Sequence, residues 1–123
     1  MILTYKDEAD FNDILSLLEK GENEQVEFKL SFISSSIEKT ISAFANTKGG
    51  DLFIGINDKG EIVGLSDQQM NDCMDRIKLI CDSMSIKCNI VGIEYRGRQF
   101  IKVTIPKQSS DGKQIMTNSG KIY

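Results

Sequence analysis

The sequence lacks histidine entirely, and this absence excludes several common kinds of active site. Serine and cysteine hydrolases of the usual types need a histidine as their general base. The three cysteines, Cys73, Cys81 and Cys88, include no C-x-x-C pair, so without histidine they cannot form the usual zinc sites. We therefore expect reduced thiols in the core. Any catalysis would have to use carboxylates, lysines, hydroxyls or a bound metal.

Long apolar runs are also missing. No stretch approaches the roughly 18 apolar residues of a membrane span, and the first residues lack the basic start and apolar run of a secretory signal. We therefore expect a cytoplasmic protein with no membrane partner. At 123 residues the chain is too short for two domains, so residues 1–123 are expected to form one domain. Its end inside an apparent strand, Lys121-Ile122-Tyr123, indicates the N-terminal part of a longer protein.

Positive charge is scarce in the first part of the sequence. Residues 1–85 contain 8 Lys and Arg against 16 Asp and Glu, whereas residues 86–123 contain 7 against 2. An acidic front and a basic end indicate an anionic partner on one face. The alternative is that the charges mix on the folded surface. The net charge of −3 argues against a nucleic-acid binder that ignores sequence.

Hydrophobic periodicity predicts three helices separated by short strands. Asp7 is the expected N-cap of the first helix, and two capping boxes, Ser35 with Glu38 and Ser66 with Gln69, are expected to begin the others. The expected order is helix 7–20, strand 26–31, helix 35–46, a hairpin of strands 51–56 and 61–65, helix 66–84, two strands within 86–105, and an incomplete strand near the end. This order predicts an α+β fold, with a mixed, mostly antiparallel sheet of about five or six strands and three helices.

Two stretches carry a distinctive pattern: residues 21–29, GENEQVEFK, and residues 41–60, ISAFANTKGGDLFIGINDKG. Gly49 and Gly50 should end the second helix and turn directly into a strand, so much of the second pattern can be explained as architecture. Together the stretches resemble the Schlafen/AlbA-type DNA-binding domain family, whose hallmarks are an E-x4-E-F-K strand entry and an AFANT-x-GG-x-L-x-I-G-x-x-D segment. The resemblance implies the DNA-binding domain of a bacterial transcriptional regulator, with structured RNA as another candidate partner.

The resemblance also implies a second activity. In the eukaryotic Schlafen branch, a similar trio of two glutamates and an aspartate is associated with metal-dependent RNA cleavage. Glu22, Glu27 and Asp58 fall on those motif positions, and Lys29 falls on the lysine that follows. Three such oxygen ligands can hold Mg²⁺ or Mn²⁺, which would activate water, while the ammonium steadies the phosphate. As an alternative, these catalytic and metal-binding candidates are ordinary charges at turns and on a strand edge.

For nucleic-acid binding, which requires no cofactor, the candidates are four basic residues: Lys29, Arg96, Arg98 and Lys102. Arg98 and Lys102 share strand parity and could contact phosphates from one face. Alternatively, these charges only protect a strand edge from pairing with another chain. The acidic total favours a third interpretation, a protein-interaction or homo-oligomerisation module. The sequence contains no G-x-x-x-x-G-K-[ST] loop, so we do not predict ATP hydrolysis.

Overall fold

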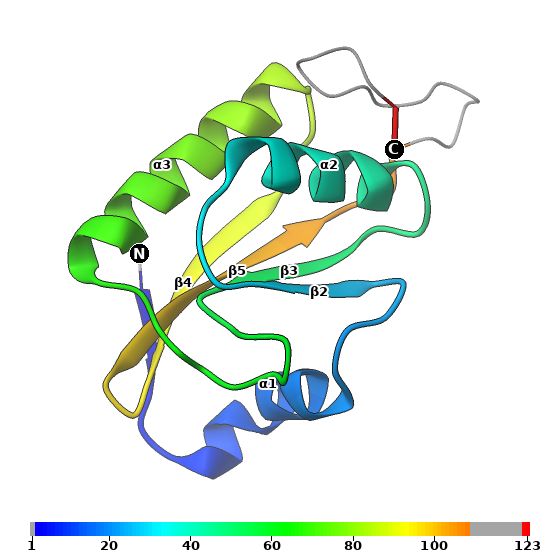
Figure 1. Ribbon diagram of the computed structural model, residues 1–123. Helices are drawn as coiled ribbons and strands as arrows, with labels where there is room; N and C mark the ends of the chain where they lie inside the picture. Colours follow the sequence, from blue (N-terminus) through cyan, green and yellow to red (C-terminus); the bar gives the residue numbers. More distant parts are fainter. Residues whose placement is uncertain (1, 109–121) are drawn as a thin grey trace.

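The computed structural model describes residues 2–108 and 122–123, which form one sheet with helices on both faces (Figure 1). The elements in chain order are β1 (Ile2–Tyr5), α1 (Glu8–Lys20), β2 (Val26–Lys29), α2 (Ser34–Ala45), β3 (Gly50–Ile54), α3 (Asp67–Ser83), β4 (Asn89–Tyr95) and β5 (Arg98–Ile105). The predicted α+β class, with three helices and a mixed sheet of about five strands, is confirmed.

The strands lie in the order β1-β4-β5-β3-β2. The centre of the sheet is antiparallel, because β5 pairs in that sense with both β3 and β4. The two edges are parallel pairs, β1 with β4 and β2 with β3. The strands β2 and β3 therefore need a crossover connection, and α2 provides it.

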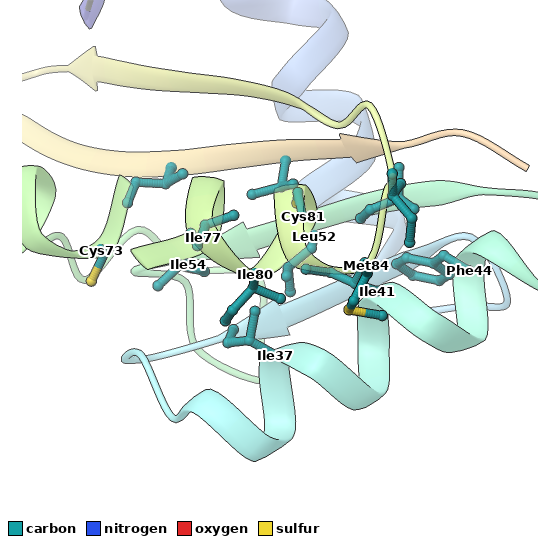
Figure 2. Close-up of a cluster of buried hydrophobic side chains, with 14 of the residues drawn as sticks. Ile37, Ile41, Phe44, Leu52, Ile54, Cys73, Ile77, Ile80, Cys81 and Met84 are labelled. Atoms are coloured by element: carbon teal, nitrogen blue, oxygen red, sulfur yellow. The ribbon is translucent and has the colours of Figure 1, made fainter. Parts of the chain in front are cut away.

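The two faces of the sheet are covered by different helices (Figure 1). Helices α2 and α3 pack on one face, where Ile41 and Ile77 join a buried cluster with Ile101 of β5 (Figure 2). Helix α1 packs on the other face, where Phe11 stacks on Tyr95 with ring centroids 4.0 Å apart. Successive strand residues point to opposite faces, so each central strand contributes side chains to both layers.

The predicted helix starts are right in two cases and wrong in one. The Asp7 side chain accepts from the amide of Asp10, and Ser66 forms the expected capping box with Gln69. The second helix instead begins after Ile33, and this N-cap residue makes no side-chain cap hydrogen bond. The expected capping box of Ser35 with Glu38 is therefore wrong, because the helix already contains both residues.

The second helix ends within one residue of the expected position 46, but the two glycines expected to end it lie further along the chain. Helix α2 stops at Ala45 with Asn46 as its C-cap, before Gly49-Gly50. The glycines instead make the turn into β3: the Gly49 amide donates to the Phe44 carbonyl, and Gly49 has a φ of 78°. Glycine adopts such a positive φ at little energetic cost because it has no Cβ.

The expected hairpin strand at residues 61–65 is not a strand. This segment makes isolated bridges, Ile56 with Ile62 and Leu65 with Gln99, and otherwise forms a loop over the end of α1. Gly60, with a φ of 80°, lies so close to α1 that a Cβ on it would collide with the carbonyl oxygen of Leu18. The loop follows the helix instead of pairing with β3.

Strand β1, which the sequence patterns did not predict, lies at one edge of the sheet. Of the incomplete strand expected at Lys121-Ile122-Tyr123, the first residue lies outside the described residues, and Ile122 and Tyr123 belong to none of the strands of the sheet. Within residues 2–108 and 122–123, no helix is both long and apolar enough to cross a membrane.

Candidate functional site

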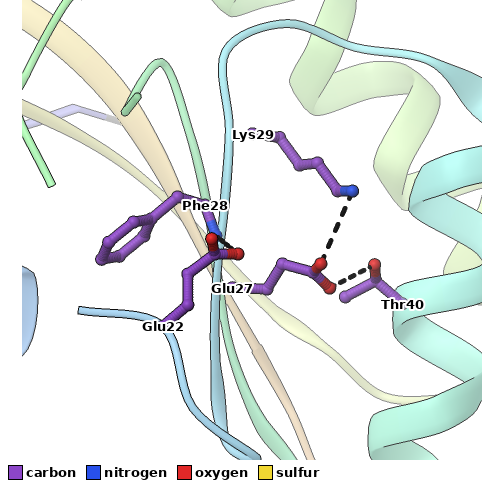
Figure 3. Close-up of polar contacts among 5 residues, drawn as sticks. All are labelled: Glu22, Glu27, Phe28, Lys29 and Thr40. Carbon is purple, nitrogen blue, oxygen red and sulfur yellow. Dashed lines mark hydrogen bonds and ion pairs between the residues drawn. The ribbon is translucent and has the colours of Figure 1, made fainter. Parts of the chain in front are cut away.

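The first candidate residues lie on β2, where strand alternation separates two kinds of side chain. Val26 and Phe28 are buried towards α1, whereas Glu27 and Lys29 point to the face that α2 covers. Thr40 of α2 donates its hydroxyl to Glu27 Oε2 at 2.7 Å, and Lys29 Nζ lies 3.6 Å from Glu27 Oε1 (Figure 3). The half-buried Glu27 carboxylate thus joins α2 to β2.

Glu22 has a different role at the outer edge of the same strand. The backbone amide of Phe28 donates to Glu22 Oε2 at 3.2 Å (Figure 3). Next to it, Asn23 and Val26 exchange both of their backbone hydrogen bonds. The amide and carbonyl of Val26 and the amide of Phe28 are therefore occupied by the chain's own loop, which disfavours the addition of another strand at this edge.

Asp58, the third predicted carboxylate, is exposed in the turn that follows β3. The Asn57 side chain fixes this turn by accepting from the amides of Lys59 and Glu61. The turn packs on α1 through Gly60, on the opposite face of the sheet from Glu27.

Within the described part of the chain, no group of three or more aspartate, glutamate, cysteine or histidine residues is placed to hold a metal ion. Glu22, Glu27 and Asp58 are thus spread over the edge and both faces of the sheet, and in this arrangement they do not fit a divalent ion. The predicted metal site at these residues stays a prediction to be tested with the ion itself.

The predicted basic residues divide between the two faces. Lys29 lies on the α2 side beside Glu27, whereas Arg98 and Lys102 share the α1 side, with the buried Phe100 between them. Arg98 and Lys102 therefore lie on the same side of β5, as their spacing predicted. Four residues of strand separate them by about 13 Å.

Arg96 and Arg98 flank Gly97 in the turn between β4 and β5. Arg96 adopts a φ of 51°, and its guanidinium lies 5.1 Å from the centroid of the Tyr95 ring. Its ion pair with Glu8 is long, at 3.9 Å, and both side chains are about two-thirds exposed (69% and 67%). An exposed pair of this length contributes little stability, so Arg96 can exchange it for another anion.

Arg98 is held more firmly. Its Nη1 donates to the carbonyl oxygen of Ile62 at 2.7 Å and so attaches the 55–65 loop to the turn. A pocket of about 410 Å³ lies beside this contact, lined by Leu15, Leu18, Gly60, Ile62, Tyr95, Arg96 and Arg98. The sequence predicted its arginines but neither Leu15 nor Ile62, because no sequence pattern links the loop to the turn.

The three cysteines are free thiols, and Cys73 and Cys81 are buried as expected, whereas Cys88 is half-buried. Burial raises the pKa of Cys73, with a further contribution from the carboxylate of Asp72. A hydrogen bond from Cys88 lowers the pKa of Cys81, and the same bond raises the pKa of Cys88. These thiols lie outside the candidate sites.

The sequence profile of the family described as "Schlafen, AlbA_2" matches residues 22–123. The chain belongs to this family. The match includes both motif stretches from Glu22 onward, and the family is generally associated with nucleic acids.

A solved structure is similar to this domain: the crystal structure of the DIP2311 protein from Corynebacterium diphtheriae, with a TM-score of 0.60 and 17% sequence identity. The similarity covers 91% of this chain but only 27% of that one. At this identity the likeness shows the fold alone, and this Schlafen/AlbA_2 domain spans about a quarter of the length of the protein it resembles.

Proposed function

We propose that this Schlafen/AlbA_2 domain binds nucleic acid through the α1 side of β5, and that it serves as the DNA-binding part of a longer transcriptional regulator. The observation that carries the proposal is the common side shared by Arg96, Arg98 and Lys102. Guanidinium and ammonium groups are donors that commonly contact phosphate oxygens in protein–nucleic acid complexes.

The charge balance limits how this surface binds. The chain has a net charge of −3, and Glu8 lies beside Arg96. We therefore expect a small number of phosphate contacts and a shallow salt dependence, unlike the steep dependence of strongly basic proteins.

The test is fluorescence anisotropy of a labelled nucleic acid at several salt concentrations. Arg96→Gln combined with Lys102→Gln should weaken binding about tenfold, and it should reduce the slope of log Kd against log salt by about 2. Arg98 is left in place because it holds Ile62.

The matched control removes the same charge from the other side of the molecule. Lys48 and Lys78 are both exposed, the first after α2 and the second on α3. The variant Lys48→Gln with Lys78→Gln should bind like the wild type. Equal losses of affinity in both double variants would mean that only net charge matters. Unchanged binding in Arg96→Gln with Lys102→Gln would reject this surface.

Metal-dependent RNA cleavage is the alternative function, and the adjacent Glu27 and Lys29 are the feature that favours it, because they match the motif and lie 3.6 Å apart. A homo-oligomerisation module is a third possibility, and gel filtration at increasing concentration would reveal it.

A further inference from the structure

The pocket beside the β4–β5 turn combines an apolar floor with a cationic rim. Leu15 and Leu18 of α1 form the floor together with Ile62 and the ring of Tyr95. Arg96 and Arg98 line the same pocket and are exposed, so we assign them to its rim. At about 410 Å³, the pocket is near the lower end of the range for small-molecule sites.

Several contacts hold this pocket open without a ligand. The Tyr95 ring is buried and fixed by stacking on Phe11. The loop that carries Ile62 is attached by the hydrogen bond from Arg98 and by the close approach of Gly60 to α1. Binding of a ligand would therefore cost little conformational entropy in this part of the protein.

An apolar floor beneath planar cations is suited to a nucleobase. Arginine guanidinium groups stack on the faces of bases, and apolar side chains pack against them. The exposed Arg96 can at the same time contact the phosphate next to that base. A base can reach such a pocket only when it is unstacked, as in a single strand or a loop.

We infer that this pocket receives one unstacked base of single-stranded nucleic acid, while Arg96 contacts the adjoining phosphate. The inference rests on the proposed function of the same side of β5 and adds a preference for single strands over duplex.

The experiment compares a short labelled single-stranded DNA of mixed sequence with the duplex of the same sequence, by anisotropy. Ile62→Gln keeps the net charge but makes the floor polar, and it should weaken single-strand binding about five- to tenfold while leaving duplex binding unchanged. The matched control is Val63→Gln, because Val63 is the neighbouring residue, is 52% exposed and does not line the pocket. It should bind both forms like the wild type.

A second variant and a measurement on the wild type distinguish the loss of the pocket from the misfolding of one variant. Leu15→Gln alters the floor from α1 and should reproduce the effect of Ile62→Gln. In the wild type, a nucleoside monophosphate should shift the NMR signals of Ile62 and Leu15, whereas inorganic phosphate should shift only those of the arginines.

The possible failures can be told apart. If Arg96→Gln with Lys102→Gln weakens binding but both floor variants bind single strands normally, the base pocket is wrong and the proposed function stands. If the floor variants weaken both forms equally, the single-strand preference is wrong. If neither form binds the wild type, both proposals are rejected.

Discussion

The two faces of the sheet use their charged residues in opposite ways. On the α2 side, Glu27 and Lys29 contact each other, and Glu27 also accepts a hydrogen bond from Thr40. On the α1 side, the exposed Arg96 has a long ion pair with Glu8 and lies over the Tyr95 ring, and Arg98 borders a pocket. The motif residues of β2 therefore support the fold, whereas residues outside the motif remain accessible to an anionic ligand.

The largest expected effect comes from removing the loop that completes the α1 side. In Gly60→Ala the new Cβ would meet the Leu18 carbonyl oxygen, at a φ that disfavours side chains. We expect the free energy of unfolding to fall by about 3 kcal/mol, measured by urea denaturation.

The control for this variant separates the clash from the backbone conformation. Gly97 has a similar φ of 77°, but within the described structure nothing lies within 4 Å of a Cβ built on it. Gly97→Ala should therefore lose only about 1 kcal/mol. Equal losses in the two variants would mean that the loop does not pack on α1 as described.

The next effect tests the α2 side. Thr40 is buried, and Thr40→Val removes the hydroxyl that binds Glu27, so the free energy of unfolding should fall by about 1 kcal/mol. Thr104→Val is the matched control, because Thr104 donates to Asp51 Oδ1 at a similar 2.8 Å but is exposed. It should lose less than about 0.5 kcal/mol. A larger loss in the control would contradict the structural role given to Glu27.

A smaller effect is expected at the outer edge of β2. Glu22→Ala leaves the Phe28 amide without its acceptor, so this amide should exchange its hydrogen faster, and stability should fall by about 0.5 kcal/mol. Glu24→Ala removes the same charge from the same loop and should leave the exchange of Phe28 unchanged. Hydrogen exchange followed by NMR compares the two, and equal protection of Phe28 in both would show that Glu22 does not cap the edge.

The sequence predicted the features that depend on neighbouring residues. Asp7 and Ser66 cap their helices because the amides that they accept from lie three residues ahead. Strand β1 escaped prediction because it is a four-residue edge strand that pairs with β4 at the other end of the chain, for example Leu3 with Ile93. Pairing across such a distance leaves no local pattern.

In the candidate site, too, only the features that depend on neighbouring residues could be predicted. Arg98 and Lys102 could be assigned to one face because they belong to one strand, and alternation fixes the direction of their side chains. The pocket could not be predicted, since Arg98 and Ile62 are 36 residues apart and meet only after the loop has folded over α1. The family motif identified the fold without locating this surface.

The smallest expected effect is the response to a divalent ion. The structure disperses Glu22, Glu27 and Asp58, so millimolar Mn²⁺ should leave the Tm unchanged, because a ligand stabilises a protein only if it binds the folded state. Labelled structured RNA should likewise remain intact when Mn²⁺ is added. Differential scanning fluorimetry and a gel assay measure the two outcomes. A rise in Tm that is lost in Glu27→Gln, together with RNA cleavage lost in the same variant, would instead support the nuclease alternative. It would mean that the carboxylates regroup around the ion, which requires Glu27 to release Thr40 and Glu22 to release the amide of Phe28.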